Sequence, residues 1–505
     1  MKPKRIVILG GGTAGWMAAN LFARAWPSHE VRVSLVESPQ IGTVGVGEGS
    51  TPTLKRFFEM IDVPEAQWMP RCNATYKVSI AFEGWSPKSG LARYAHPFVS
   101  QIDTLSQNTF MGNCRRRRFG LDVHTDPGDF FLNGVLAQAR KGPQAAQTFP
   151  FVMDYGYHFD AGKLGAFLAQ TAVGRGVQHL QRRVVSVEQD DAGDLAALIA
   201  EGEERIEADF FVDCSGFASV LIEKTLGVRF ESFADNLFND AAVVLPTPVE
   251  ERALPVETVS VALSNGWCWR IPLTHRFGNG YVYSSRYLDS DAAERELRDF
   301  LGLTESSEEA RHLRMRVGQR EHHWYRNCLS LGLSQGFIEP LEATALLLTQ
   351  ISVELFIHHF KKGAFEREDR DAFNRLVHQR FERVRDYIVA HYKLNTREDS
   401  AYWRDNRDNM VLSKSLRQLL DVWYRRGDLT QEVQRQKLES HFGSLSWHCL
   451  LSGYGAYPEL SKEQPDANDL YREAGVAHML RGCALNFREH RENLSVLRES
   501  TKVRA

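Results

Sequence analysis

The sequence has 505 residues, of which 43% are apolar and 11% aromatic, so the chain can bury a large core. Its formal charge of -3 and its pI of about 6.6 exclude a strongly basic surface for nucleic acid or an anionic membrane, and we interpret the run Arg115–Arg118 as a solvated loop. The seven cysteines show neither a disulfide framework nor metal-ligand spacing, and the longest apolar run, residues 345–357, is interrupted by Gln350 and Glu354. We therefore expect a cytoplasmic protein with no bound metal, no leader peptide, no membrane span and no nucleic-acid partner.

The chain begins with the pattern of a strand, a glycine-rich turn and a helix. Residues 5–9 are a β-branched run, residues 16–25 have helical character, and the next apolar run, residues 31–36, ends at an acid. In a dinucleotide-binding fold the glycines let the backbone approach a pyrophosphate at the helix N-terminus, and the acid binds the ribose. The candidate cofactor-binding residues here are Gly10, Gly12, Thr13, Ala14, Gly15 and Glu37.

Two later segments are typical of further backbone contacts to a flat cofactor. Residues 44–52 contain three glycines in five positions and end at a proline, which predicts a loop that can lie against a ligand; its candidate contacts are Val46, Gly47 and Glu48. Residues 208–216 are a buried strand that runs into a small-residue turn at Gly216. The nucleotide-binding half is thus assembled from distant pieces of the chain.

The remaining pattern predicts a second sheet and a helical end. Residues 75–160 and 230–330 contain β-rich segments, such as 259–263 and 281–284, and from Gly363 onward apolar residues recur mostly at intervals of three and four. We predict an α/β fold in two parts: residues 1–360 form one composite Rossmann-like module with an inserted substrate-side sheet, and residues 361–505 form a mainly helical C-terminal cap.

The most distinctive segment is Gly266–Pro272, in which Trp267 and Trp269 project on the same face of an extended strand. The glycine and the proline mark the ends of that strand. Such a wall of indole suits a channel that excludes water from a cofactor, although an aromatic pair in the core of a sheet is the alternative.

This Trp-x-Trp-x-Ile-Pro pattern, the glycine-rich start and the segment Glu339-Pro340-Leu341-Glu342 together resemble the flavin-dependent halogenases of the tryptophan halogenase family, from about Lys4 to about Pro458. The resemblance implies an FAD enzyme in which reduced FAD and dioxygen oxidise a halide to hypohalous acid. The acid then halogenates an electron-rich aromatic substrate by electrophilic substitution. In the family pattern Gly336 and Leu341 also contact the cofactor, and the reduced FAD comes from a separate flavin reductase.

The resemblance assigns the two catalytic roles to Lys77 and Glu342. From sequence alone Lys77 would be a surface lysine, and Glu342 would be a carboxylate in the first turn of a helix that begins at Pro340. The family motif Thr75-Tyr76-Lys77 implies instead that Lys77 holds hypohalous acid or carries the halogen as a haloamine. Glu342 would polarise the electrophilic halogen and accept the proton that the ring loses.

The family binds halide through main-chain groups of a Thr-Gly pair that follows Glu-Ser. Here the chain reads Glu342-Ala343-Thr344-Ala345, so the halide candidates are Thr344 and Ala345. Because alanine replaces both the serine and the glycine, bromide and chloride both stay open.

The aromatic substrate is implied to lie against three further side chains. His96 and Phe98 match the family's His-x-Phe pair, and Phe442 roughly replaces a stacking tryptophan. The region before Phe442 is short for the lid that grips an amino-acid head group, so we expect indole or a larger indole- or phenol-like scaffold, free or tethered to a carrier, rather than free tryptophan.

Three other functions share the fold. An FAD-dependent aromatic hydroxylase would carry a Gly-Asp pair where this chain has Gly332-Leu333-Ser334-Gln335-Gly336. A nicotinamide dehydrogenase leaves the glycine loop and the two tryptophans unexplained, and a non-catalytic flavin-binding protein stays open. A homodimer is a further expectation.

Overall fold

A computed structural model describes residues 4–42, 47–249, 254–363, 367–440, 442–464 and 469–502. The chain forms two compact units, each assembled from three stretches of sequence. Unit 1 consists of Met1–Asn73, Phe159–Ala234 and Met315–Glu382, and unit 2 of Ala74–His158, Asp235–Arg314 and Arg383–Ala505. The predicted division at residue 360 stays a prediction.

Unit 1 is built on a six-stranded sheet whose five consecutive strands from β23 to β9 are parallel, with β22 antiparallel at the edge. Its strand order is β22 (Trp324–Tyr325), β23 (Cys328–Ser330), β13 (Phe210–Asp213), β1 (Arg5–Leu9), β2 (Arg32–Glu37) and β9 (Gln178–Gln181). The apolar runs predicted at residues 5–9 and 31–36 correspond to β1 and β2, two interior strands of this sheet, and such runs are typical of a parallel sheet covered on both faces.

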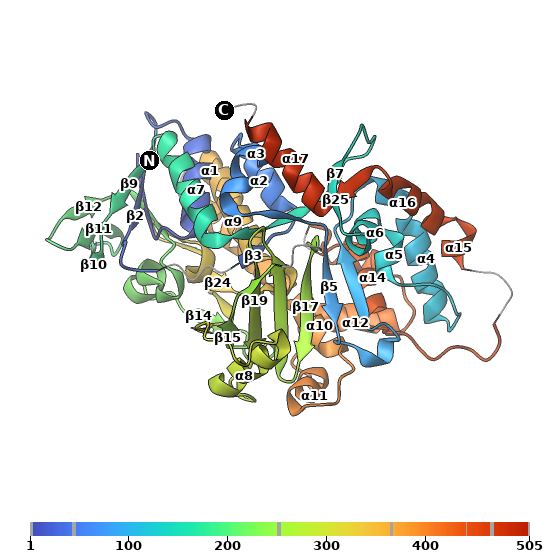
Figure 1. Cartoon of the computed structure of the whole chain (residues 1–505). Helices are drawn as coiled ribbons and strands as arrows, with labels where there is room; N and C mark the ends of the chain where they lie inside the picture. Colours follow the sequence, from blue (N-terminus) through green and yellow to red (C-terminus); the bar gives the residue numbers. More distant parts are fainter. Residues whose placement is uncertain are drawn as a thin grey trace. The chain divides into compact units, whose positions relative to one another are not determined.

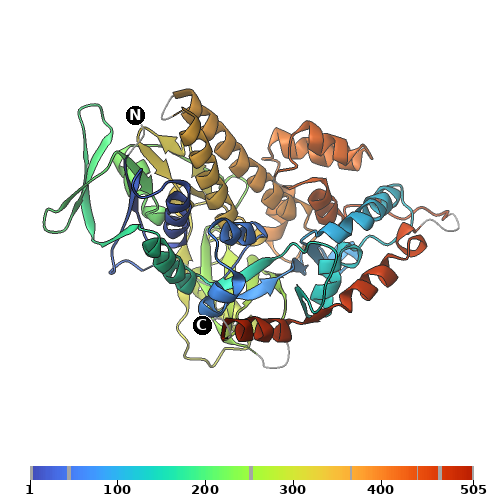
Figure 2. The ribbon, with the colours of Figure 1, turned by 90° about the horizontal axis from the view of Figure 1, so that it is seen from above.

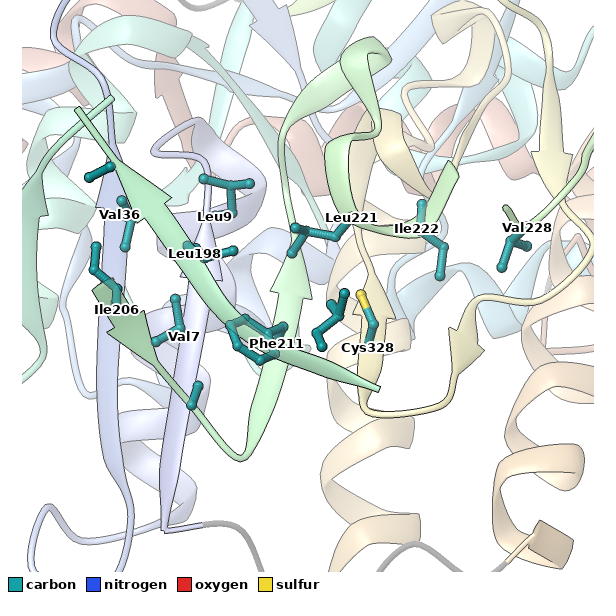
Figure 3. Close-up of a cluster of buried hydrophobic side chains, with 13 residues drawn as sticks. Val7, Leu9, Val36, Leu198, Ile206, Phe211, Leu221, Ile222, Val228 and Cys328 are labelled. Atoms are coloured by element: carbon teal, nitrogen blue, oxygen red, sulfur yellow. The ribbon is translucent and has the colours of Figure 1, made fainter. Parts of the chain in front are cut away.

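Both faces of this sheet are buried within unit 1. Val7 and Leu9 point into an apolar cluster that they share with the small sheet of β10 (Val184–Gln189), β11 (Leu195–Ala200) and β12 (Arg205–Glu207) (Figure 3). The alternate residues Ile6 and Ile8 point to the other face. There α1 (Thr13–Ala25) packs beside both α7 (Ala161–Gly174) and α9 (Ala345–Gly363) (Figures 1 and 2). The result is a three-layer, Rossmann-like arrangement, as predicted.

The carboxylate of Asp213, at the end of β13, fixes the turn that follows it. One oxygen accepts hydrogen bonds from the N–H and the hydroxyl of Ser215 at 3.0 and 2.6 Å, and the other accepts the N–H groups of Leu221 and Ile222, both at 2.8 Å. The remaining elements of unit 1 are short: β3 (Gly47–Gly49), α2 (Thr53–Met60), α3 (Glu65–Trp68), η1 (Pro70–Cys72), η4 (Gly216–Ala218), η5 (Val220–Thr225), β14 (Phe230–Ser232), β21 (Gly318–Arg320), η6 (Gly332–Ser334), β24 (Gly336–Phe337) and η7 (Pro340–Glu342).

Unit 2 contains the predicted substrate-side sheet. Its strands run in the order β20 (Arg311–Arg314), β15 (Ala241–Val244), β19 (Arg276–Tyr283), β18 (Gly266–Pro272), β17 (Glu257–Leu263), β5 (Ser79–Glu83) and β6 (Arg93–Pro97), and β16 (Thr247–Pro248) pairs with β19. One face packs on α8 (Ser290–Leu301) through an apolar cluster that includes Cys268, Tyr281, Ala293 and Leu297. Two small ladders lie outside this sheet: β4 (Thr75–Lys77) with β8 (Gly156–Asp160), and β7 (Lys141–Ala145) with β25 (Phe487–Glu489).

The C-terminal stretch is mainly helical, as predicted. Helix α10 (Arg367–Leu394) is shared between the two stretches that meet at residue 382, and the other helices of unit 2 are α4 (Gln107–Arg118), α5 (Pro127–Phe130), α6 (Leu132–Gln138), α11 (Ala401–Asp408), α12 (Lys414–Tyr424), α13 (Leu429–Arg435), α14 (Ser444–Gly453), α15 (Leu470–Glu473), α16 (Val476–Ala484) and α17 (His490–Lys502). Of the helices in the described ranges, none combines the length and the apolar character that a bilayer crossing requires.

The interpretation of Arg115–Arg118 as a loop is wrong, because these residues form the last turn of α4. Arg118 is buried, and its guanidinium donates hydrogen bonds to the carbonyl oxygens of Val422, Trp423 and Gly427 at the end of α12. A basic residue there satisfies carbonyls that the helix leaves unpaired.

Candidate active site

The glycine-rich turn in unit 1 is shaped to admit a pyrophosphate. Gly10 has φ +114°, and a Cβ there would lie 2.2 Å from the carbonyl oxygen of Cys214; a Cβ on Gly15 would lie 2.0 Å from the carbonyl oxygen of Gly10. A Cβ on Gly12, by contrast, would meet no atom of the described residues within 4 Å. Gly12 is also the N-cap of α1, so open space lies where the first N–H groups of that helix, including those of Thr13 and Ala14, can receive an anion.

Glu37 lies against this turn, as the spacing predicted. Its carboxylate occupies the space that a side chain at Gly11 would need, since a Cβ there would fall 1.5 Å from Oε2. The other oxygen, Oε1, is 2.7 Å from Nε2 of His179, whose ring packs edge-on against Trp16. No local sequence pattern identifies His179, because only the pairing of β9 with β2 brings it beside Glu37.

The other predicted cofactor contacts lie in short elements of unit 1. Gly47 and Glu48 are in β3, and Val46 lies outside the described residues. Burial, and then the charge of Asp160, raises the pKa of Glu48 to about 7. Gly216, with φ +69°, opens η4, and η4 packs against η6. A Cβ on Gly332, the first residue of η6, would lie 2.7 Å from the Cβ of Ala14. The loop that leads to Gly336 in β24 therefore approaches the start of α1.

The segment from Pro340 differs from its predicted form. Pro340–Glu342 is a separate 3-10 turn, and α9 begins only at Ala345, so the prediction that Glu342 lies in the first turn of that helix is wrong. The break is at Ala343, which has φ 55° and ψ 38°, a left-handed conformation that costs a non-glycine residue about 1 kcal/mol. Leu341 and Glu342 are both buried in this turn.

The later start of α9 places Thr344 and Ala345 at a true helix N-terminus. Thr344 is 1% exposed, and its hydroxyl has no hydrogen-bond partner among the residues that the structure describes. Ala345, which replaces the family's glycine, is the first helical residue and is exposed, and alanine suits that conformation. A buried hydroxyl and the N–H groups of a helix start are a donor set that can receive a halide ion.

In unit 2, the two tryptophans lie on one face of the sheet, in a strand with the predicted bounds. Trp267 and Trp269 are 1% and 6% exposed, and their ring centroids are 6.1 Å apart. The ring of Trp269 lies over Gly280 on the neighbouring strand, where a Cβ would fall 2.1 Å from Cζ2. His96 lies on the same face, because cross-strand partners and alternate residues lead to it from Trp269 through Ser260, Thr258 and Ile80.

Lys77 is completely buried, which contradicts the surface position that its residue type alone favours. It ends β4, two residues before β5, and its Nζ lies 5.5 Å from the ring centroid of Phe98. Burial, followed by the charges of Lys77 and His490, holds the pKa of His158 well below its usual value, so a neutral imidazole lies beside the ammonium. The His158 ring is fixed at both nitrogens, 3.0 Å from the hydroxyls of Thr75 and Thr258.

The aromatic residues predicted to hold the substrate belong to a larger group. Phe442 stacks on Tyr387 with a centroid distance of 3.7 Å and an interplanar angle of 3°, and the ring of His96 is 5.9 Å from Tyr387. The Tyr387 hydroxyl donates to the carbonyl of Ser446 at 3.0 Å. Tyr387 was missed from the sequence because it appears there only as one apolar position in a helical repeat.

The chain is similar to known proteins over most of its length. A family model described as tryptophan halogenase matches residues 5–469. The tryptophan 6-halogenase SttH of Streptomyces toxytricini is 38% identical over 442 residues, which cover 83% of this chain and 84% of that protein. The 7-chloro-L-tryptophan 6-halogenase KtzR of Kutzneria sp. (strain 744) is 34% identical over 483 residues, or 89% and 90% of the two chains.

A solved structure shows the same fold. The flavin-dependent halogenase Xcc4156 of Xanthomonas campestris superposes with a TM-score of 0.84 at 33% identity, over 98% of this chain and 99% of that one. The similarity therefore covers both units.

Proposed function

This chain belongs to the tryptophan halogenase family, and from that premise we propose how its residues halogenate an aromatic ring. It is an enzyme, a flavin-dependent halogenase with an aromatic substrate. The observation that carries the residue assignment is the complete burial of Lys77 on the strand next to the sheet that bears Trp267 and Trp269. Lysine is seldom fully buried, and buried ionisable groups are concentrated at functional sites, which supports the assignment.

The residues of unit 1 fit FAD. The open space at Gly12 would receive the pyrophosphate, Glu37 the ribose, and Gly216, Gly336 and Leu341 the flavin end, with Gly47 and Glu48 alongside. When bound in its reduced form, FAD supplies with dioxygen the two-electron oxidation that converts halide to hypohalous acid. We assign the supply of reduced FAD to a separate flavin reductase.

For the halide we propose the start of α9. The hydroxyl of Thr344 and the first N–H groups of the helix, with Ala345, would donate to the ion. The donors carry no formal charge, so the site favours an ion that loses water easily. We therefore expect bromide to be used at least as well as chloride.

Lys77 would hold the hypohalous acid by a hydrogen bond from Nζ, and the indole rings of Trp267 and Trp269 would keep water and substrate away from the flavin. In the substitution the O–X bond of the acid breaks, a C–X bond forms, and the ring C–H bond breaks. The proton passes to the carboxylate of Glu342, and the hydroxide leaves as water after protonation.

His96, Phe98 and Phe442 would stack on the substrate ring. We propose an indole or a larger indole- or phenol-like scaffold in preference to free tryptophan, with reaction at the most electron-rich carbon. All seven cysteines are free thiols, which fits the cytoplasm we propose as its location. The predicted homodimer stays a prediction, which light scattering of the purified protein tests.

The test is halogenation by the Lys77→Ala variant with reduced FAD, halide and an indole in excess. We expect product formation to fall by about 10²–10⁴-fold, the range for loss of a positioned acid–base group, while FAD binding is unchanged. Lys88→Ala is the matched control, because Lys88 is exposed and pairs with Glu398 on the surface. Wild-type rates in Lys77→Ala would refute the assignment.

A further inference from the structure

His490, the first residue of α17, is tied to the strand that carries Lys77. Its imidazole is 1% exposed. The N–H of Tyr76 donates to Nε2 at 3.1 Å, and Nδ1 lies 2.8 Å from the carbonyl oxygen of Pro255. A backbone N–H can only donate and a carbonyl can only accept, so the proton of the ring is on Nδ1 and the lone pair is on Nε2.

The ring keeps this neutral tautomer at pH values above its pKa. Burial lowers the pKa of His490 to about 4, so the ring stays neutral and Nε2 remains an acceptor. The ring is itself held in place, because its own backbone N–H donates to the carbonyl of Arg140 at 2.9 Å. The imidazole is therefore a fixed acceptor rather than a mobile side chain.

Hydrogen bonds hold the backbone on both sides of Lys77. On one edge β4 pairs with β8, in the register Tyr76 with Tyr157 and Lys77 with Gly156. The amide of Tyr76 is taken by His490, and the amide of Val78 donates to the carbonyl of Val256 at 2.8 Å. The hydroxyl of Thr75 donates to the carbonyl of Pro272 at 2.7 Å, and the carbonyl of Val78 accepts the N–H of Phe98 at 2.9 Å, so both ends of this segment are held. Loss of the Tyr76–His490 bond would free the backbone directly before Lys77 and let Lys77 shift.

We propose that His490 is a positioning residue for Lys77, which it serves by holding the amide of Tyr76. The inference rests on the role proposed above for Lys77. It extends the active-site machinery beyond residues 5–469, the part that the family model matches. A displacement of about 1 Å at a reacting group lowers a rate by as much as about 10²-fold, so the effect is measurable.

The test compares three variants in the full-length protein with reduced FAD, bromide and indole. His490→Phe keeps the ring but removes both polar atoms, and His490→Gln offers an amide oxygen to Tyr76 and an N–H to Pro255. Asn493→Ala is the matched control, because Asn493 lies in the same helix and exchanges two hydrogen bonds with the backbone of Gln144 on β7, at 3.0 and 3.1 Å, rather than with β4.

In His490→Phe we expect product per reduced FAD to fall by about 10-fold or more, while hypohalous acid that escapes into the buffer, captured as the haloamine of added taurine, rises to match. FAD affinity should not change. His490→Gln should recover most of the product, and Asn493→Ala should keep the wild-type ratio even where it lowers Tm. If His490→Phe does not fold, His490→Asn, whose side chain is too short to reach Tyr76, takes its place.

Two results would overturn the inference: a wild-type ratio in His490→Phe, or an equal loss in Asn493→Ala at the same Tm. Hydrogen exchange of the amides of residues 75–78 gives a readout that needs no activity, and it should speed up in His490→Phe alone. If the wild-type protein made no halogenated product, the proposed function would fail, and the exchange rates would still decide whether His490 holds β4.

Discussion

Trp269→Ala tests which of two roles Trp267 and Trp269 have: they can insulate the flavin chemistry, or they can only pack the core of the sheet. The side chain is 6% exposed and rests on Gly280, whose missing Cβ leaves the space that the ring fills. An aromatic side chain buries about 150–250 Å², which at about 25 cal/mol per Å² corresponds to about 4–6 kcal/mol. Truncations of buried tryptophan cost about 3–5 kcal/mol, so we expect a loss of about 4 kcal/mol in unfolding free energy.

A second substitution distinguishes the loss of stability from the loss of insulation. In the wild-type protein the methyl group of Gly280→Ala would overlap the indole ring of Trp269, because its carbon would lie 2.1 Å from Cζ2. In Trp269→Ala the same methyl group would enter the cavity that the indole ring leaves. We expect Trp269→Ala/Gly280→Ala to regain about 1 kcal/mol of stability, the value of one buried methyl, and to regain no insulation. Opening the wall should raise the peroxide released per halogenated product in both the single and the double variant.

The assay measures peroxide, product and reduced FAD consumed, together with urea unfolding. Tyr281→Ala is the matched control, since Tyr281 is a buried ring on the adjacent strand that faces the opposite side of the sheet. It should lose stability and keep its coupling. If Trp269→Ala kept wild-type coupling, or if Tyr281→Ala uncoupled equally, the tryptophans would be core residues and the insulation argument would be wrong.

Four further predictions concern Glu342 as the general base, the source of reduced FAD, the carboxyl group of Glu48, and the substrate. Glu342→Gln should slow halogenation by about 10²–10³-fold, measured with saturating reduced FAD. NADH alone, without a reductase, should give no product. The pKa of Glu48 is raised by burial from 4.5 to about 7, so the folded protein holds a proton that the unfolded chain has lost and stability falls as pH rises through this window. At pH 8 the unfolding free energy of Glu48→Gln, measured by urea denaturation, should therefore exceed that of the wild type by up to about 3 kcal/mol. At pH 4 the two proteins should be equally stable. In a competition of indole and tryptophan with both halides, indole and bromide should prevail.

Each of these has a result that contradicts it. Unimpaired turnover of Glu342→Gln would remove the base from the mechanism, and product formed from NADH in reductase-free protein would remove the separate reductase. A pH-independent gain in Glu48→Gln would mean that the carboxylate titrates normally. Clean chlorination of free tryptophan on its benzene ring would refute the open substrate site.

The features of the fold and of the candidate site that could be predicted from sequence are those that depend only on residues close together in the chain. Gly10, Gly15 and Glu37 follow from local spacing, because a tight turn and an acid at a strand end require fixed residue types. Trp267 and Trp269 follow from the alternation of a strand. Their side of the sheet is settled only by the pairing with neighbours, which no local pattern contains.

The errors have a common physical origin in long-range contacts and unusual backbone. Pro340 predicts a helix start, yet the left-handed conformation of Ala343 delays the helix to Ala345. Lys77 is buried by elements far away in the chain, against the tendency of its residue type. Tyr387 contacts His96 and Phe442, and His490 contacts Tyr76, through tertiary packing alone, and tertiary context routinely overrides local preference.

The bond between Tyr76 and His490 spans 414 residues of sequence. During synthesis at about 5–20 residues per second, the strand with Lys77 leaves the ribosome about 20–80 s before the imidazole that holds it. The segment that contains the proposed site residues His96 and Trp267 has also been made before His490. The amide of Tyr76 therefore lacks this acceptor until the chain around residue 490 has been made and has folded, and on the role proposed for His490 the strand reaches its final position only then.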